Sequence, residues 1–476
     1  MRLRAFLPVS VLTALVSISC ATTAAFTDEA RVTEAVRSGN AAAGVEVFRR
    51  QMPERDPILW NFDLALLERW AGNYAAAIPL MNSTDRLMEA AVTKSVTQEI
   101  GAALLNESIA DYTGTLYEYL YINAFNALNY YSAGNFDEAL VEVRRMGNKQ
   151  KAYMARSGIQ QATVQSDADA FADVQKSARS LGVDTAQIAS RTPRAPEDAD
   201  IFRDSSFARY VSAVFRVMDG DTDNARVDAD VIAALNPAFP IREEFAVPPG
   251  NGRIDVLAFS GLIGRRTEQT LYFPEDFTGG LIPLLSLSVD GVDIPAFRIK
   301  FAWPVFLRSS DSSTVARIRV RLSNGRVMEL PVLEDFNRAV EMDVQAAAQS
   351  AFRRSVVRSI SKKAVAVAAG AATLYAAKQR LTESGGGVVS SLLYYSAYLG
   401  VVAAIAAVDQ GETADVRQCR YLPRMVHAGG CTVEPGTYDV AVQYIGRAGN
   451  IVFEKRYTDI TVREGQTVLV ESSWLE

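Results

Sequence analysis

The chain has 476 residues, which is enough for two or three domains that each bury a core of their own. Hydrophobic residues make up 49% of it, a share that excludes an intrinsically disordered protein. The net charge of −6 argues against non-specific binding to nucleic acid.

The first segment has the pattern of an export signal. Arg2 and Arg4 precede an uncharged run that ends in small residues at Ala25, and this order is typical of a secretory signal peptide. The residues before Cys20 resemble the lipobox of bacterial lipoproteins, in which that thiol takes a diacylglycerol and becomes the new N-terminus. We therefore expect a signal peptide at 1–19 and lipidation at Cys20. The alternative is ordinary cleavage after Ala24 or Ala25.

Residues 28–236 have the pattern of paired amphipathic helices. A glycine followed by Asn or Asp separates the helical stretches at Gly39, Gly72, Gly134 and Gly220. Glycine adopts the positive φ that ends one helix, and Asn or Asp suits the turn into the next. Gly39 and Gly72 are 33 residues apart, close to the 34-residue period of tetratricopeptide (TPR) repeats. We expect a TPR-like α-solenoid with irregular spacing.

The second half of the chain predicts an α+β protein. After a boundary rich in proline and glycine, hydrophobic residues alternate as in strands over 252–332 and again over 413–476. The Asn324-Gly325 pair is a strong hairpin signal. Between these parts, 333–412 has helical periodicity. We expect one antiparallel, sandwich-like β domain that is interrupted by a helical hairpin insert.

The insert contains two apolar runs, at 364–377 and 388–408, separated by glycines at 385–387. The first run is shorter than the roughly 20 residues that a bilayer requires, whereas the second is long enough. A spanning helix there would put the last strands in the wrong compartment. We therefore favour a helical hairpin that packs on the protein, a partner or a membrane surface, with a membrane span as the alternative.

Two further stretches suggest a family. The first contains Asp111, Tyr112, Gly114, Tyr117 and Glu118, and the second contains Asp415, Arg417, Leu422 and Pro423. With the lipobox, they resemble an uncharacterised family of bacterial envelope lipoproteins with a TPR-like N-terminal half. The resemblance implies a lipid-anchored protein with envelope proteins, such as curli-export-like lipoproteins, as partners, and it implies no reaction. Because Ala21 stands where an aspartate would favour inner-membrane retention, we expect the outer membrane, facing the periplasm.

The remaining cysteines, Cys419 and Cys431, form an even pair once Cys20 is lipidated. In an oxidising periplasm such a pair usually bonds, so we expect a disulfide. Cys419 stands where family members usually have tryptophan, which favours the same pairing. The alternative is two reduced, buried thiols.

The inventory of reactive residues argues against an enzyme. His427 is the single histidine, so a multi-histidine zinc site is excluded, and no glycine-rich nucleotide-binding motif is present. We expect no cofactor and no metal. Asp219, Asp221 and Asp223 occupy the first positions of a calcium loop, but Asn224 and Asp230 break the pattern. A helix junction with acidic N-caps explains these residues better.

Glu118 is the one charged residue in 112–136, a stretch rich in tyrosine, phenylalanine and aliphatic residues, which predicts a buried helix. A buried carboxylate needs a partner, and we expect Arg144 or Arg145 on the next helix. Tyr117, Tyr121 and Asn123 either line a concave peptide-binding surface or form an interhelix core. We assign partner binding to Asp111, Tyr112, Tyr117, Glu118, Tyr121, Asn123, Arg144, Asp415 and Arg417.

We therefore expect a non-enzymatic, lipid-anchored scaffold or adaptor that binds proteins. The rival hypothesis is an enzyme acting on cell-wall glycan with two carboxylates. Asp111 and Glu118 are seven residues apart and would share one face of a continuous helix, which is the feature that favours the rival.

Overall fold

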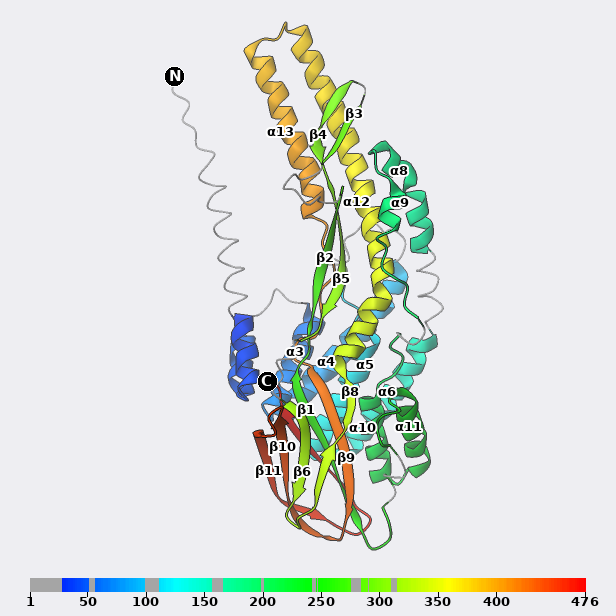
Figure 1. The fold of residues 1–476 in the computed structure, drawn as a ribbon, viewed down its shortest axis with the longest axis vertical. Coiled ribbons are helices and arrows are strands. Elements are labelled where there is room, and N and C mark those ends of the chain that lie inside the picture. The colour runs from blue at the N-terminus through cyan, green and yellow to red at the C-terminus, as the bar shows by residue number, and fades with distance from the viewer. Residues whose placement is uncertain are drawn as a thin grey trace.

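The computed structural model describes residues 28–50, 56–98, 111–155, 166–197, 201–241, 245, 247–274, 284–289, 291–309 and 315–476. The predicted signal peptide and Cys20 lie outside this part of the chain. The fold is mixed α+β with N-terminal helices and C-terminal sheets, as expected. Figure 1 shows an elongated molecule with most helices and sheets at one end and two long helices projecting at the other.

The N-terminal half consists of helices that pack mainly as sequential neighbours. The pairs α3–α4, α5–α6 and α10–α11 make these contacts, and α5 also contacts α4 and α10. Gly39, Gly72, Gly134 and Gly220 all have φ between 77° and 82°, so each predicted turn glycine has the left-handed conformation. The helix bounds are α2 (Ala41–Arg49), α3 (Pro57–Trp70), α4 (Tyr74–Gln98), α5 (Leu116–Ser132), α6 (Phe136–Ala155), α8 (Gln175–Ser180), α9 (Thr185–Ala189), α10 (Ser206–Met218) and α11 (Thr222–Leu235).

Within the described residues, the strands form two four-stranded sheets and two antiparallel two-stranded pairs. The larger sheets have the orders β12-β1-β9-β8 and β11-β10-β6-β7, and the smaller pairs are β2-β5 and β3-β4. Asn324-Gly325 lies in the β6–β7 hairpin, as predicted. The strand bounds are β1 (Gly252–Leu262), β2 (Arg265–Phe273), β3 (Leu285–Val289), β4 (Val292–Phe297), β5 (Ile299–Leu307), β6 (Val315–Leu322), β7 (Val327–Leu330), β8 (Val332–Asp335), β9 (Pro423–Val433), β10 (Gly436–Gly446), β11 (Ile451–Val462) and β12 (Thr467–Trp474).

One sheet is mixed, whereas the sequence predicted antiparallel pairing throughout. β12 pairs with β1 in parallel, with Arg253 opposite Thr467 and Ser260 opposite Trp474. The chain forms the antiparallel β10–β11 pair in one sheet and then enters the other sheet at its edge. β12 therefore reaches β1 after a crossover, which permits parallel pairing.

The sheet that contains β1 is covered on both faces. Leu257 and Phe259 of β1 belong to the same apolar cluster as Phe125 and Phe207 of the helical half. Ile254 and Val256 belong instead to the cluster shared with the other large sheet. This layering explains why every residue of β1 is buried.

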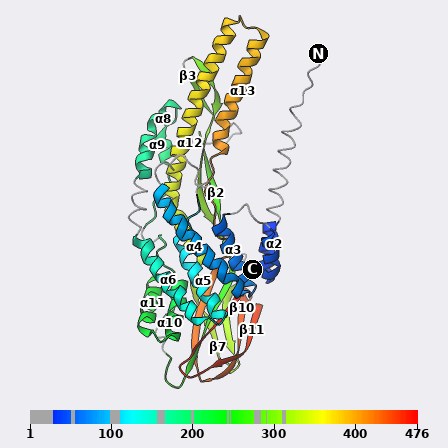
Figure 2. The same ribbon diagram turned by 180° about the vertical axis from the view of Figure 1, so that it is seen from behind.

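Two long helices separate β8 from β9. α12 (Phe336–Glu383) has 48 residues and is about 70 Å long at 1.5 Å per residue. The chain reverses at Gly385 and Gly386, both with positive φ, into α13 (Val388–Gln410). Figures 1 and 2 show both helices reaching beyond the rest of the protein, with the β3–β4 pair alongside them.

Candidate functional site

The residues assigned to partner binding mostly meet inside the protein, where the helical half joins the strands and α12. Glu118, Tyr117 and Tyr112 are almost completely buried there. We call this cluster the polar joint, and it comprises Asp63, Tyr112, Tyr117, Glu118, Arg266, Asp343, Asp415, Arg417 and Cys419.

Glu118 has hydrogen-bond partners on both carboxylate oxygens. The Tyr112 hydroxyl donates to Oε2 at 2.6 Å and the Thr115 backbone N–H donates to the same oxygen at 3.0 Å. The Cys419 N–H donates to Oε1 at 3.4 Å. Glu118 thus caps α5 in a capping box, which the Thr115-x-x-Glu118 pattern in the sequence would have predicted.

Arg266 is the cation that faces Glu118, and the predicted pairing with Arg144 or Arg145 is wrong. Arg266 pairs with Asp343 at 2.9 Å and donates to the Tyr117 hydroxyl at 3.3 Å. Burial raises the pKa of Glu118, and the Arg266 charge opposes this rise. Arg144 is exposed, and Arg145 pairs with Glu142 at 2.9 Å. Because β2 follows α5 by more than a hundred residues, no local pattern pointed to Arg266.

Arg417 connects the two stretches that carry the family resemblance. Its guanidinium binds both oxygens of Asp415, at 2.9 and 2.8 Å, and lies 5.3 Å from the centre of the Tyr112 ring. These groups are occupied by contacts within the chain. The joint therefore fixes the segment before β9 against α5 and leaves little polar surface for a substrate.

Tyr121 and Asn123 are core residues, which is the second of the two alternatives for them. Tyr121 donates to Glu334 at 2.5 Å, and Asn123 donates to Glu142 at 2.6 Å. Both side chains are at most 1% exposed. They do not line a concave surface, because the neighbouring helices, β8 and α12 cover them.

The carboxylate pair of the rival glycan hypothesis is not assembled. α5 begins at Leu116, so Asp111 lies outside the helix and is exposed. Glu118 lies inside α5 and is 1% exposed. The premise that both project from one helix face is wrong, since the capping box starts the helix between them.

The predicted disulfide is also wrong, because both cysteines are free and buried. The Cys419 thiol donates to Asp63 at 3.2 Å within the cluster between helices and sheet. Cys431 lies on β9 in the cluster between the two large sheets. They are on different faces of one sheet layer, which keeps them apart. Burial raises the pKa of both thiols.

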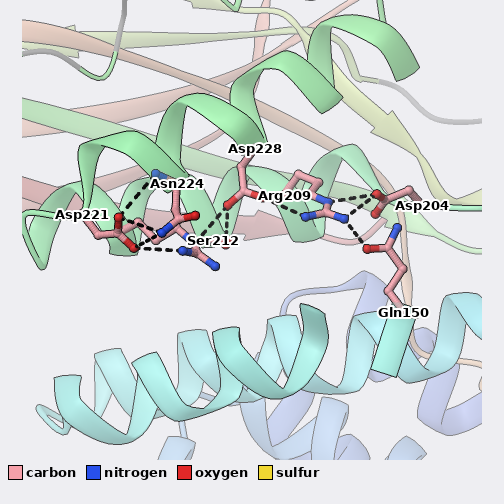
Figure 3. Close-up of polar contacts among 8 residues, drawn as sticks. Gln150, Asp204, Arg209, Ser212, Asp221, Asn224 and Asp228 are labelled. Atoms are coloured by element: carbon pink, nitrogen blue, oxygen red, sulfur yellow. Dashed lines mark hydrogen bonds and ion pairs between the residues drawn. The ribbon is translucent and has the colours of Figure 1, made fainter. Parts of the chain in front are cut away.

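The acidic stretch at 219–230 is a helix junction. Asp221 caps α11 and pairs with Arg216 at 2.9 Å. Asp228 pairs with Arg209 at 2.8 Å and accepts from Ser212 at 2.6 Å. Figure 3 shows Arg209 between Asp228, Asp204 and Gln150, which joins α10 and α11 to α6. Across the described residues, no group of His, Cys, Asp and Glu side chains could hold a metal.

The feature most suited to an outside partner is the apolar surface of the two projecting helices, which we call the hairpin surface. Among the described residues, α13 is the helix long and apolar enough to cross a membrane, and only 11% of its most apolar stretch is buried. Soluble proteins rarely expose apolar patches of this kind outside interaction sites. The large members of the hairpin surface are Val365, Tyr375, Val388, Val389, Leu392, Leu393, Tyr395, Leu399 and Val402.

Buried ion pairs hold the base of the hairpin in place. Arg358 of α12 pairs with Glu412, just after α13, at 2.6 Å, and both side chains are at most 2% exposed. Lys363 pairs with Asp409 at 2.8 Å and donates to the Ile405 carbonyl at 2.7 Å. The hairpin is thus fixed to the rest of the protein by charges that have defined partners.

Comparison with known proteins gives no further indication of function. No protein-family model, curated protein or solved structure matches the chain.

Proposed function

We propose that this protein is a non-enzymatic docking scaffold of the bacterial cell envelope, anchored by lipid at Cys20 in the outer membrane and facing the periplasm. The observation that carries this proposal is the hairpin surface, where Leu392 and Leu399 are 66% and 67% exposed. Leaving so much apolar area in water is unfavourable at roughly 25 cal/mol per Å². A partner that covers this surface removes that cost.

The helical half is the second component of the proposal. We assign it as a TPR-like unit that holds other envelope proteins, such as curli-export-like lipoproteins. The antiparallel helix pairs and the left-handed turn glycines support this assignment. The polar joint connects this unit to α12 through Arg266 and Asp343.

The internal contacts of these polar and titratable groups support a role without chemistry. Glu118 caps a helix, Asp415 binds Arg417, and His427 is buried on β9 with its Nδ1 3.1 Å from the Leu330 carbonyl oxygen. Burial lowers the pKa of His427 to about 4, so it stays neutral near pH 7 and is shielded from a substrate.

Accessibility of the hairpin in cells tests the docking function. We would compare Leu392→Cys with Val327→Cys, which is 52% exposed on the distant β7. In the purified protein an impermeant maleimide should modify both cysteines. In cells with a permeabilised outer membrane, docking predicts that modification at 392 slows at least tenfold while 327 is unchanged. Equal rates at 392 in cells and in solution contradict docking.

Metabolic palmitate labelling tests the anchor separately. Wild type should incorporate label and Cys20→Ser should not, because the thiol accepts the lipid. Equal labelling of the two proteins contradicts lipidation at Cys20.

A further inference from the structure

The hairpin surface covers more than half of the circumference of α13. Ser390, Val401 and Ile405 lie on one buried stripe of this helix. At 100° per residue, the exposed positions occupy an arc of about 200° opposite that stripe. The arc contains no charged side chain between Val388 and Val408. An apolar arc this wide is suited to an environment that surrounds the helix, whereas one packed helix covers a narrower stripe.

The second half of α12 also exposes apolar side chains. Val365 is 70% exposed and Tyr375 is 46% exposed. Gly370 allows α13 to approach closely, since an added Cβ would lie 2.6 Å from a Val401 methyl. The two helices therefore pack closely against each other, and both carry exposed apolar side chains. Charged groups return only near the turn, at Lys378, Arg380 and Glu383.

The other side of the hairpin is covered by β3 and β4. Val292, Ile294 and Phe297 of this pair share one apolar cluster with Val367 and Val401. Its exposed positions are Ser286, Ser288 and Asp293, which are polar, and the small residue Ala296. The projecting part of the protein, formed by α12, α13, β3 and β4, thus has an apolar face made by helices and a largely polar face made by strands.

We propose that the hairpin surface docks onto a phospholipid bilayer and lies in the interface of one leaflet, with β3 and β4 facing water. This inference rests on the proposed docking function and names its partner. Lipid covers an apolar arc of any width, whereas a second copy of the chain covers a single stripe and leaves the remainder exposed.

The same elements exclude a full span with the hairpin intact. Lys378 donates to the Gly291 carbonyl at 2.8 Å, so the β3–β4 turn lies level with the distal part of α12. A bilayer that enclosed the hairpin would also enclose this two-stranded pair. The backbone N–H and C=O groups on the free edges of this pair would have no hydrogen-bond partners in hydrocarbon. The interface accommodates both faces, because one side remains in water.

Flotation with vesicles of phosphatidylethanolamine and phosphatidylglycerol tests the inference. The mature chain with Cys20→Ser, freed of its signal, should float with vesicles in the absence of a lipid anchor. Leu392→Glu with Leu399→Glu should lower the bound fraction at least tenfold, whereas Val327→Glu should not change it. Circular dichroism should be the same for all three proteins. Flotation that is equal in the three proteins, or absent in all, overturns the inference.

Two further measurements identify other occupants. Sodium carbonate should release the bound Cys20→Ser protein, and retention would show a span and overturn interfacial docking. Concentration-dependent self-association that Leu392→Glu abolishes, without flotation, would identify a second copy and also overturn it. If position 392 is protected in cells but the protein does not float, only the lipid inference fails. If 392 is also accessible in cells, the docking function fails as well.

Discussion

The base of the helical hairpin and its projecting part face opposite requirements within one continuous helix, α12. At the base, Arg358 and Lys363 carry charges into the interior, where both side chains are at most 2% exposed. In the projecting part, Val365 and Tyr375 carry apolar side chains into solvent. The first arrangement is stable because each charge has a partner within the chain. The second has no such compensation inside the protein, which is why we assign docking to it.

The largest effect is expected at the base of the helix. Arg358→Ala leaves Glu412 buried without the guanidinium 2.6 Å away, so the free energy of unfolding should fall by about 3–5 kcal/mol. Arg317→Ala is the matched control, because its pair with Glu329 is exposed and 3.4 Å long; the loss there should be at most about 1 kcal/mol. Urea unfolding followed by circular dichroism measures both. Similar losses of unfolding free energy in the two variants would contradict the expected difference between the buried and the exposed ion pair.

The buried histidine in the body of the protein should give the next largest effect. Its folded pKa of about 4 lies below the ordinary value of 6.5. Between pH 6.5 and 4 the unfolded chain therefore binds the proton more readily, and stability should fall by about 3 kcal/mol as pH drops. His427→Gln should flatten this slope. Because His427 is the single histidine, its NMR titration is unambiguous, and a midpoint near 6.5 would rule out the burial effect.

The contact between the projecting helices should have a smaller effect. Gly370→Val places side-chain atoms against Val401, where a Cβ alone is 2.6 Å from a methyl. We expect a loss of about 1–3 kcal/mol and faster hydrogen exchange in α13. Gly400→Ala is the control, since nothing lies within 4 Å of its added Cβ; helix propensity predicts a gain of up to about 1 kcal/mol. A similar loss of stability in both variants would contradict the prediction that only position 370 is closely packed.

The smallest effect concerns the cysteines. Since Cys419 and Cys431 are free, reduction should leave the unfolding midpoint of the Cys20→Ser protein unchanged. Thiol titration should find two thiols after denaturation and slow reaction before it, because burial raises the pKa of each. A mass spectrum of the non-reduced digest that contains the bridged peptide would overturn this assignment.

Several elements could be predicted because their signals are local. The turn glycines, the Asn324-Gly325 hairpin and the reversal near Gly385 depend on backbone conformations that neighbouring residues specify. Glu118 was correctly expected to be buried. Its role was missed, although Thr115 three residues earlier completes a capping box.

Long-range pairings could not be predicted in the same way. Arg266 reaches Tyr117 across 149 residues, and Cys419 reaches Asp63 across 356. The parallel pairing of β12 with β1 is equally distant in the chain. Such contacts depend on which layers stack on each other, so residue type alone does not specify them.

The sequence by itself determined the α+β division, the turn glycines and the uncharged apolar length of 388–408, since composition and short-range spacing carry these properties. Tertiary structure alone decided which groups face water. It buried the polar residues around Glu118, separated the two cysteines and left most of α13 exposed. The physical reason is that the burial of a residue depends on what the fold places around it. Charged side chains are stable in the interior where the fold brings partners to them, and apolar side chains stay exposed where no other element covers them.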